Sequence, residues 1–309
     1  MSRTIKEYML ISIKGIAMGA ADIVPGVSGG TIAFITGIYE ELIESIDNIN
    51  LGLFNTLRKD GFKKFWTALN GNFLLSLFLG IIISILSLAN LMKYLLEHQA
   101  VMTWSFFFGL ILGSAWLIGK SEKGWKLKEY IALIVGSSIA YYITVSDSIQ
   151  SPNSYPFLIL AGAIASCAMI LPGISGSFIL LLLGKYKYIM QAISDIKILD
   201  ILSVALGVVI GLLSFSKFLN WLFKTQKKTT MALLTGFMIG SLNKVWPWRN
   251  TITTALNRHG IEIPVLQKSV LPQHFEQDPQ IILAILCSAL GLVLIFFVQY
   301  GSKAKEEKI

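Results

Sequence analysis

Two short elements rich in glycine and serine carry the residue types best suited to binding a ligand. Residues 25–32 read PGVSGGTI, and residues 172–179 read PGISGSFI. The proline lacks an amide hydrogen and the glycines permit tight backbone conformations, so each element should end one helix and begin another. The free amides at such a start carry about half a positive charge and bind anions such as phosphate or carboxylate.

The amides and hydroxyls of both elements form the candidate substrate site. Small residues also let helices pack closely, but two copies at matching positions favour ligand binding. Ser28 and Ser175 are each placed to cap the helix that follows. The candidate substrate-binding residues are Pro25, Gly26, Ser28, Gly29, Gly30, Thr31, Pro172, Gly173, Ser175, Gly176 and Ser177.

One acidic residue, Asp22, lies in an apolar run three positions before Pro25. A carboxylate in such surroundings costs several kcal/mol unless it is paired or protonated, so Asp22 is a candidate for proton coupling. The alternative is a structural role, in which Asp22 caps nearby backbone or pairs with Lys14 or with a lysine of the other half of the chain. The residue types leave both interpretations open.

Basic residues follow the second element, whereas the corresponding stretch after the first is acidic. Solvated helix ends would account for both. The alternative is that Lys185, Lys187 and Arg249 gather an anionic lipid headgroup.

Histidine and cysteine give no support for a metal site or for catalysis. The three histidines lack metal-ligand spacing, and Cys167 and Cys287 lie in apolar runs as small hydrophobic residues do. A lipid phosphatase or transferase would need a nucleophile or an acid–base pair, but no histidine lies in an apolar segment and Asp22 has no evident carboxylate partner. We therefore expect no enzyme, no metal and no cofactor beyond coupling to a proton gradient.

The composition as a whole is that of a membrane protein. Of 309 residues, 54% are hydrophobic and 14% are charged, whereas soluble domains have about 25% charged residues. Disorder, a disulfide scaffold and an ordinary cytosolic enzyme are excluded. The net charge of +8 reports membrane topology rather than nucleic-acid binding. We expect one transmembrane domain over residues 1–309.

A repeat organises the chain. The two elements are 147 residues apart, and the same spacing relates Gly37 to Gly184. Farther along, the spacing falls to 127 because about twenty extra residues, predicted to be a loop, lie between positions 50 and 72. The two repeats span residues 8–146 and 157–300.

Each repeat opens with an interrupted apolar segment, 9–46 or 157–193, and continues with three apolar runs close to the length of a membrane-spanning helix. The runs are 73–92, 101–118, 130–146, 201–219, 231–246 and 280–298. If the interrupted segments are re-entrant hairpins and the N-terminus is cytoplasmic, the connections and tails on the inside hold sixteen Lys and Arg and the connections on the outside hold five. If each interrupted segment instead crossed the membrane once, the same count would be nine Lys and Arg inside and twelve outside. The positive-inside rule therefore favours hairpins, with both termini cytoplasmic.

A hairpin plus three crossings is an odd number, so the second repeat must be inverted relative to the first. The predicted fold is an all-α polytopic membrane protein with an inverted repeat, each half a broken re-entrant hairpin plus three transmembrane helices. Such repeats with broken helices are typical of transporters that alternate access. A scaffold would explain neither the repeat nor the breaks. A soluble-anion transporter or channel stays open as an alternative, although it would need a continuous polar pathway. The connection 247–279 is either a lid or an inert loop.

The segments 19–31, GAADIVPGVSGGT, and 171–177, LPGISGS, resemble the paired signature of the PopT-type polyprenyl-phosphate transporter family, and the resemblance covers nearly the whole chain. It implies a flippase in the bacterial plasma membrane. The implied substrate is undecaprenyl phosphate, the lipid carrier of cell-wall and peptidoglycan precursors. Such proteins return the used carrier from the outer to the cytoplasmic leaflet, so the implied partners are this lipid and the bilayer.

Overall fold

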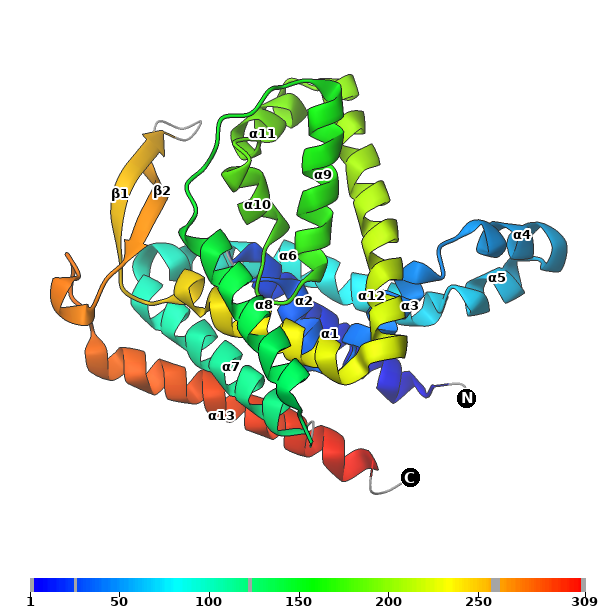
Figure 1. The fold of residues 1–309 in the computed structure, drawn as a ribbon, viewed down its shortest axis with the longest axis horizontal. Coiled ribbons are helices and arrows are strands. Elements are labelled where there is room, and N and C mark those ends of the chain that lie inside the picture. Colours follow the sequence, from blue (N-terminus) through cyan, green and yellow to red (C-terminus); the bar gives the residue numbers. More distant parts are fainter. Residues whose placement is uncertain (1–2, 25–26, 122–123, 257–261, 307–309) are drawn as a thin grey trace.

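The computed structural model describes residues 3–24, 27–121, 124–256 and 262–306. Figure 1 shows a helical molecule with one small β-hairpin at its edge. Within the described ranges, three helical stretches are long and apolar enough to cross a membrane, and two shorter helices are also apolar. The long stretches are Gly71–His98, Ala100–Lys120 and Ile198–Val245, and the shorter ones are Tyr155–Ile170 and Ile281–Phe297. The chain is an all-α polytopic membrane protein, as its composition predicts.

The first half contains eight described helices. They are α1 (Ile5–Ile23), α2 (Gly29–Ile35), α3 (Tyr39–Asp47), α4 (Leu51–Asp60), α5 (Phe62–Ala68), α6 (Gly71–His98), α7 (Ala100–Ser121) and α8 (Leu127–Val145). The extra stretch 50–72 was expected to be a loop, and this expectation is wrong. It forms α4 and α5, because the Asn50 side chain caps α4 at the Leu53 amide and Gly61, with a φ of 85°, separates the two short helices.

The second half repeats this order without the extra pair. Its helices are α9 (Tyr155–Ile170), α10 (Gly176–Leu182), α11 (Tyr186–Ser194), α12 (Ile198–Ser241), the 3₁₀ turn η1 (Leu242–Val245) and α13 (Ile281–Glu306). The long α12 is interrupted at Gln226, whose φ and ψ are −139° and 46°. Gln99, which separates α6 from α7, has a φ of −134° and a ψ of 42°. The two parts of α12 therefore correspond to α6 and α7.

Other breaks also match between the halves. Ser28 and Ser175, which precede α2 and α10, are both extended, with ψ values of 135° and 134°. Gly37 and Gly184, which follow these helices, are left-handed, with φ values of 73° and 65°. Few residues other than glycine adopt that conformation readily, so the same turn recurs where the same glycine recurs.

The connection 247–279 contains an antiparallel hairpin. Its strands are β1 (Arg249–Leu256) and β2 (Glu262–Ser269), followed by the short turn η2 (Pro272–His274). Two indoles fix its base, because Trp246 Nε1 donates to the Val270 carbonyl at 2.8 Å and Trp248 Nε1 donates to the Pro279 carbonyl at 2.7 Å.

Helices pack in pairs both within each half and between the halves. Within the halves, α1 packs along α6 and α9 along α12. Between the halves, α8 of the first packs on α12 of the second, and α13 of the second packs on α7 of the first. The backbones approach closely: a Cβ on Gly80 would lie 2.1 Å from the Ser12 carbonyl oxygen, and one on Gly207 would lie 2.0 Å from that of Ile159. The outer faces of α6, α12 and α13 expose large aliphatic side chains, as a lipid-facing surface does.

Candidate substrate site

The two glycine elements lie against each other near the middle of the molecule, where the chain turns from α1 into α2 and from α9 into α10 (Figure 1). The Ser28 hydroxyl donates to the Met169 carbonyl at 3.1 Å, and the Gly173 amide donates to Thr31 Oγ1 at 2.8 Å. A Cβ on Gly30 would lie 2.5 Å from the Ile170 carbonyl oxygen. Residues far apart in the chain thus form one site, and glycine lets the two elements touch.

At the first element, nearby side chains already bind the backbone amides at the start of α2. Asp22 Oδ1 accepts from the Gly29 amide at 2.6 Å, and Ser28 Oγ accepts from the Gly30 amide at 3.1 Å. The expectation that these amides point freely toward a ligand is therefore wrong for this conformation. The Asp22 carboxylate takes the place of an external anion at the start of α2. Ser28 and Thr31 are buried, and Pro25 and Gly26 lie outside the described residues.

The structure distinguishes the two structural roles considered for Asp22, which are capping nearby backbone and pairing with a lysine. Lys14 Nζ donates to the Thr36 carbonyl at 2.7 Å, and the hydrogen bond of the Asp22 carboxylate runs to Gly29. Asp22 thus caps local backbone, and its position in the second half is held by the apolar Met169.

The second element is built differently. Ser175 was expected to cap α10, and this expectation is wrong. Its hydroxyl lies 2.8 Å from the Ser177 hydroxyl instead. Gly173 is left-handed, with a φ of 90°, and a Cβ there would lie 2.5 Å from Ser241 Oγ. Ser177 is exposed and Ser175 and Gly176 are partly exposed. The start of α10 therefore presents hydroxyls where the start of α2 is filled by a carboxylate.

The predicted headgroup residues lie in different surroundings. Lys185 is fully buried, and its ammonium donates to the Ser151 carbonyl at 2.6 Å and to Asn153 Oδ1 at 2.5 Å. It anchors the connection between α8 and α9, so it is not available to recruit a headgroup, and we exclude it from the site. Lys187 is exposed on α11. Arg249 Nη1 donates to the Lys244 carbonyl at 2.8 Å.

Lys244 is a residue that the sequence reasoning missed, because it was counted within the apolar run 231–246. Its ammonium lies 3.9 Å from the centre of the Phe178 ring, one residue beyond Ser177. The signal was a single cation near the end of an apolar run, where an ionisable group is a functional candidate.

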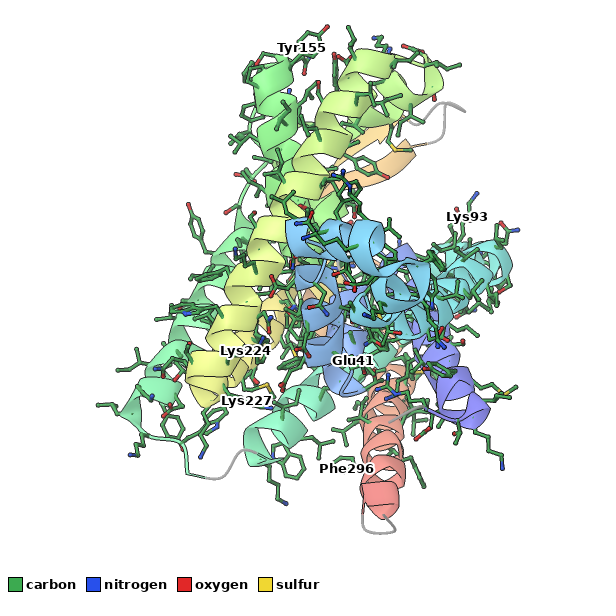
Figure 2. All side chains as sticks on the ribbon, turned by 90° about the vertical axis from the view of Figure 1, so that its right-hand side faces the viewer. Glu41, Lys93, Tyr155, Lys224, Lys227 and Phe296 are labelled. Carbon is green, nitrogen blue, oxygen red and sulfur yellow. The ribbon has the colours of Figure 1, made fainter. Side chains whose placement is uncertain are left out.

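Three side-chain contacts join α3 to α12. Lys227 Nζ lies 2.7 Å from Glu40 Oε1, Asn220 Nδ2 donates to Asp47 Oδ2 at 2.6 Å, and Lys224 lies 4.0 Å from Glu44. Figure 2 shows this corner, with Lys224, Lys227 and Glu41 labelled. We call these contacts the α3–α12 clasp. Within the described part of the chain, α11, the counterpart of α3, has no comparable packing on α6.

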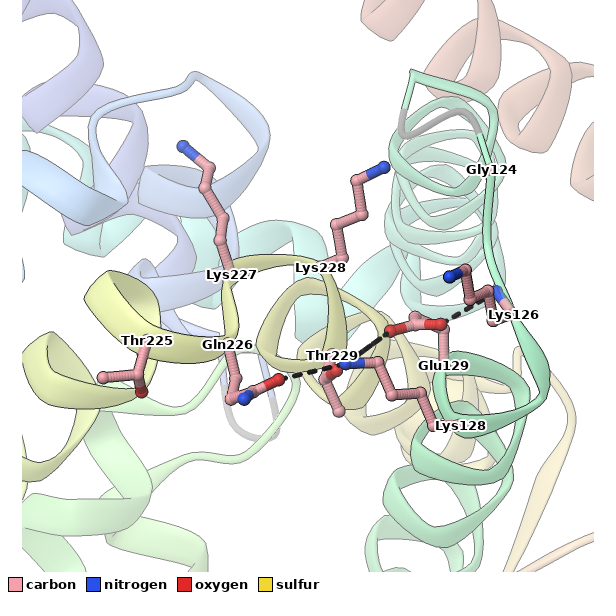
Figure 3. A pocket seen from close by; sticks show the side chains of 9 residues that line it. All are labelled: Gly124, Lys126, Lys128, Glu129, Thr225, Gln226, Lys227, Lys228 and Thr229. Atoms are coloured by element: carbon pink, nitrogen blue, oxygen red, sulfur yellow. Dashed lines mark hydrogen bonds and ion pairs between the residues drawn. The ribbon is translucent and has the colours of Figure 1, made fainter.

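Beside the clasp, the interruption of α12 at Gln226 opens a basic hollow of about 360 Å³ (Figure 3). Glu129 lies within it and accepts from the Lys126 amide at 2.8 Å and from the Thr229 hydroxyl at 3.0 Å. The cations that line it are Lys126, Lys128, Lys227 and Lys228. They come from connections that the charge distribution predicts to be cytoplasmic.

Groups of three or more metal-ligating side chains are absent from the residues that the structure describes.

Comparisons with known proteins agree on one family. The model of the VCA0040-like family, described as undecaprenyl phosphate translocase-like, matches residues 18–263. A polyprenyl-phosphate transporter of Vibrio cholerae is 47% identical over 295 residues, which cover 93% of this chain and 96% of the relative. A polyprenyl-phosphate transporter of Staphylococcus aureus is 37% identical over 261 residues, covering 78% and 88%. No solved structure is significantly similar to this chain.

Proposed function

Since the chain belongs to the undecaprenyl phosphate translocase-like family, we propose that it is a flippase that returns undecaprenyl phosphate from the outer to the cytoplasmic leaflet of the bacterial plasma membrane. Its relatives are transporters rather than enzymes, and their names support a polyprenyl phosphate as the transported lipid. In this role it would recycle the carrier for cell-wall polymer synthesis. The observation that carries the proposal is the meeting of the two glycine elements at one place in the molecule.

The physical problem is the phosphate rather than the tail. Moving a bare ion of that size into low dielectric has an idealised cost of about 20 kcal/mol. The amides and hydroxyls of Ser175, Gly176 and Ser177, together with those of the first element once Asp22 releases them, would replace the water around the phosphate. The polyprenyl tail stays in the lipid throughout, so the protein needs no pore wide enough for it.

The arrangement of the broken helices supports alternating access. In Figure 1, α1 runs toward the middle of the molecule from the N-terminus at the lower right, whereas α9 runs down to the middle from the top and α10 turns back up. We interpret them as re-entrant hairpins of inverted repeats, with six further crossings and cytoplasmic termini. Rocking of one repeat against the other would then expose the elements to one leaflet at a time.

The α3–α12 clasp indicates which side is closed here. It joins α3 of the first repeat to α12 of the second, whereas α11 has no comparable packing on α6 in the described part of the chain. We interpret this asymmetry as a conformation in which the cytoplasmic side is closed and the second element faces the outer leaflet. A lipid would enter from that side, and opening of the clasp would release it inward.

The test is exchange of fluorescent undecaprenyl phosphate between the leaflets of proteoliposomes, with and without a pH gradient. Wild type is compared with Ser28→Trp and Ser175→Trp, which fill the first and second elements. Ser87→Trp is the matched control, because Ser87 is exposed on the lipid-facing side of α6.

We expect rapid exchange in wild type and in Ser87→Trp, and little exchange in the two variants of the glycine elements. Thermal melting checks that each variant is folded, which matters most for the buried Ser28. Full activity in both element variants would refute the assignment of the two glycine elements as the substrate site. A folded wild type that exchanges no lipid but takes up radiolabelled small anions would favour the soluble-anion transporter.

A further inference from the structure

Two cations, Lys244 and Arg249, follow the end of α12, and Lys244 lies next to the second glycine element. Arg249 Nη1 donates to the backbone carbonyl of Lys244 at 2.8 Å, and both side chains are partly buried. No ion pair joins either cation to an acidic side chain within the described residues. Cations held together away from water are costly unless an anion neutralises them.

The end of α12 flanks the second element on two sides. The Lys244 ammonium lies 3.9 Å from the ring centre of Phe178, the residue after Ser177. One turn earlier, Ser241 lies so close to Gly173 that a Cβ on the glycine would sit 2.5 Å from the serine hydroxyl. The Ser175 and Ser177 hydroxyls lie between these two contacts in the chain, so Lys244 and the hydroxyls share one neighbourhood, and Arg249 is connected to it through the Lys244 carbonyl.

Arg249 is oriented before any ligand arrives. Its guanidinium carbon lies 4.3 Å from the ring centre of the buried Trp104, and the Lys244 carbonyl accepts from one nitrogen. A guanidinium has five N–H donors in a fixed plane, which suits two-point binding of phosphate. Arg249 follows the spanning helix, and burial lowers the pKa of its guanidinium to about 10, so it stays charged at neutral pH.

We propose that Lys244 and Arg249 bind the phosphate of the lipid, and that the phosphate site is built on the second glycine element rather than shared equally between the two. This inference rests on the proposed function. The halves differ in a complementary way: the first element holds the anion Asp22, whereas the second has Met169 there and gains a cation at position 244, where the first repeat has Leu117. An external phosphate would supply to the second element the negative charge that Asp22 supplies to the first.

The experiment measures binding of undecaprenyl phosphate, undecaprenol and inorganic phosphate to the purified full-length protein, alongside exchange in proteoliposomes. The variants are Lys244→Gln and Arg249→Gln. Lys268→Gln is the matched control, because Lys268 is an exposed cation on the same hairpin and its loss changes the net charge equally. Lys244→Arg and Arg249→Lys keep the charge and guard against simple loss of folding.

We expect each glutamine variant to weaken binding of undecaprenyl phosphate by about tenfold or more, the scale of one lost charge-assisted hydrogen bond. Lys268→Gln and Lys244→Arg should bind within a few-fold of wild type, whereas Arg249→Lys should bind more weakly than wild type but more tightly than Arg249→Gln because it keeps the charge and loses the two-point geometry. Undecaprenol should bind weakly and without dependence on either cation.

The outcomes separate the two proposals. If wild type exchanges the lipid and both glutamine variants bind and exchange it as wild type does, the cation pair is refuted and the flippase stands. If wild type exchanges no lipid but binds inorganic phosphate through Lys244 and Arg249, the flippase is refuted and the phosphate site stands, serving free phosphate instead of a headgroup.

Discussion

The Asp22 carboxylate shows how a residue that looks like a ligand group can belong to the scaffold. It accepts from the Gly29 amide at 2.6 Å, and a Cβ on Gly29 would lie 2.5 Å from the same carboxylate. The start of α2 is therefore neutralised from within. For a lipid phosphate to reach those amides, Asp22 must first move or take up a proton, which is how it would link transport to protons.

Two substitutions distinguish a capping role of Asp22 from proton coupling. Asp22→Asn keeps an oxygen that accepts from Gly29 but cannot be protonated in the same way, whereas Asp22→Ala removes the acceptor. Because the structure shows a cap, we expect Asp22→Asn to keep most of the transport rate. Asp22→Ala should lose about 1 kcal/mol of stability, the usual cost of a lost cap, with a lower melting temperature and slower exchange. A folded Asp22→Asn that melts as wild type does but no longer exchanges lipid would assign Asp22 to proton coupling.

At the scale of the elements, the α3–α12 clasp is the contact that would have to open for inward release in the proposed mechanism. Its ion pairs are exposed, so each contributes only about 0–1 kcal/mol, while the bond between Asn220 and Asp47 is partly buried. Such a contact biases a conformational equilibrium without dominating the stability of the fold. A weak clasp suits a transporter that would pass repeatedly between a state open to one leaflet and a state open to the other.

Charge reversal tests this role of the clasp. Glu40→Lys places two cations opposite each other, so we expect the inward-facing state to become more populated. The measurement is the labelling rate of a single cysteine at the buried Ser28, from the cytoplasmic side, in a Cys167→Ser/Cys287→Ser background. The rate should rise in Glu40→Lys and return in Glu40→Lys/Lys227→Glu.

Asp60→Lys is the control for that experiment, since it makes the same change of charge in the Asp60–Lys64 pair, away from the clasp. An equal rise in Asp60→Lys, or no rescue by the second reversal, would contradict the role assigned to the clasp.

At the scale of the whole molecule, the two halves depend on each other. α13 of the second half packs on α7 of the first, and α8 of the first packs on α12 of the second. The interface between them also contains the two glycine elements, so a shift of one half changes the site directly. The basic hollow at Gln226 lies on the side of the α3–α12 clasp, consistent with one cytoplasmic face.

Vesicle labelling tests this orientation. In the cysteine-free background, we expect Lys59→Cys to react with a membrane-impermeant thiol reagent only from the cytoplasmic side, and Lys268→Cys only from the outside. The physical reason is the excess of lysine and arginine on one side of the proposed hairpin topology. Both residues lie in segments between apolar helices, so labelling should not disturb packing. Reaction of both from the same side would exclude the proposed topology.

The positions of the helix breaks could be read from the sequence because they depend on local backbone chemistry. Proline, glycine and serine at a spacing of 147 residues predict the breaks at Ser28 and Ser175, and both serines precede a new helix. The membrane character followed from composition in the same way. Gln99 and Gln226 carry no such backbone signal, and those breaks were expected only from the gaps between the apolar runs on either side of them.

Only the tertiary structure decided which partners the polar groups at those breaks bind. Ser28 reaches a carbonyl 141 residues away and Gly173 a hydroxyl 142 residues away, so neither partner follows from local sequence. Lys185 and Lys244 are both single lysines near apolar runs. Packing turns one toward backbone and amide oxygens and places the other beside an aromatic ring at the second element. Backbone conformation is a local property of residue type, whereas the partner of a buried polar group is set by what folding brings next to it.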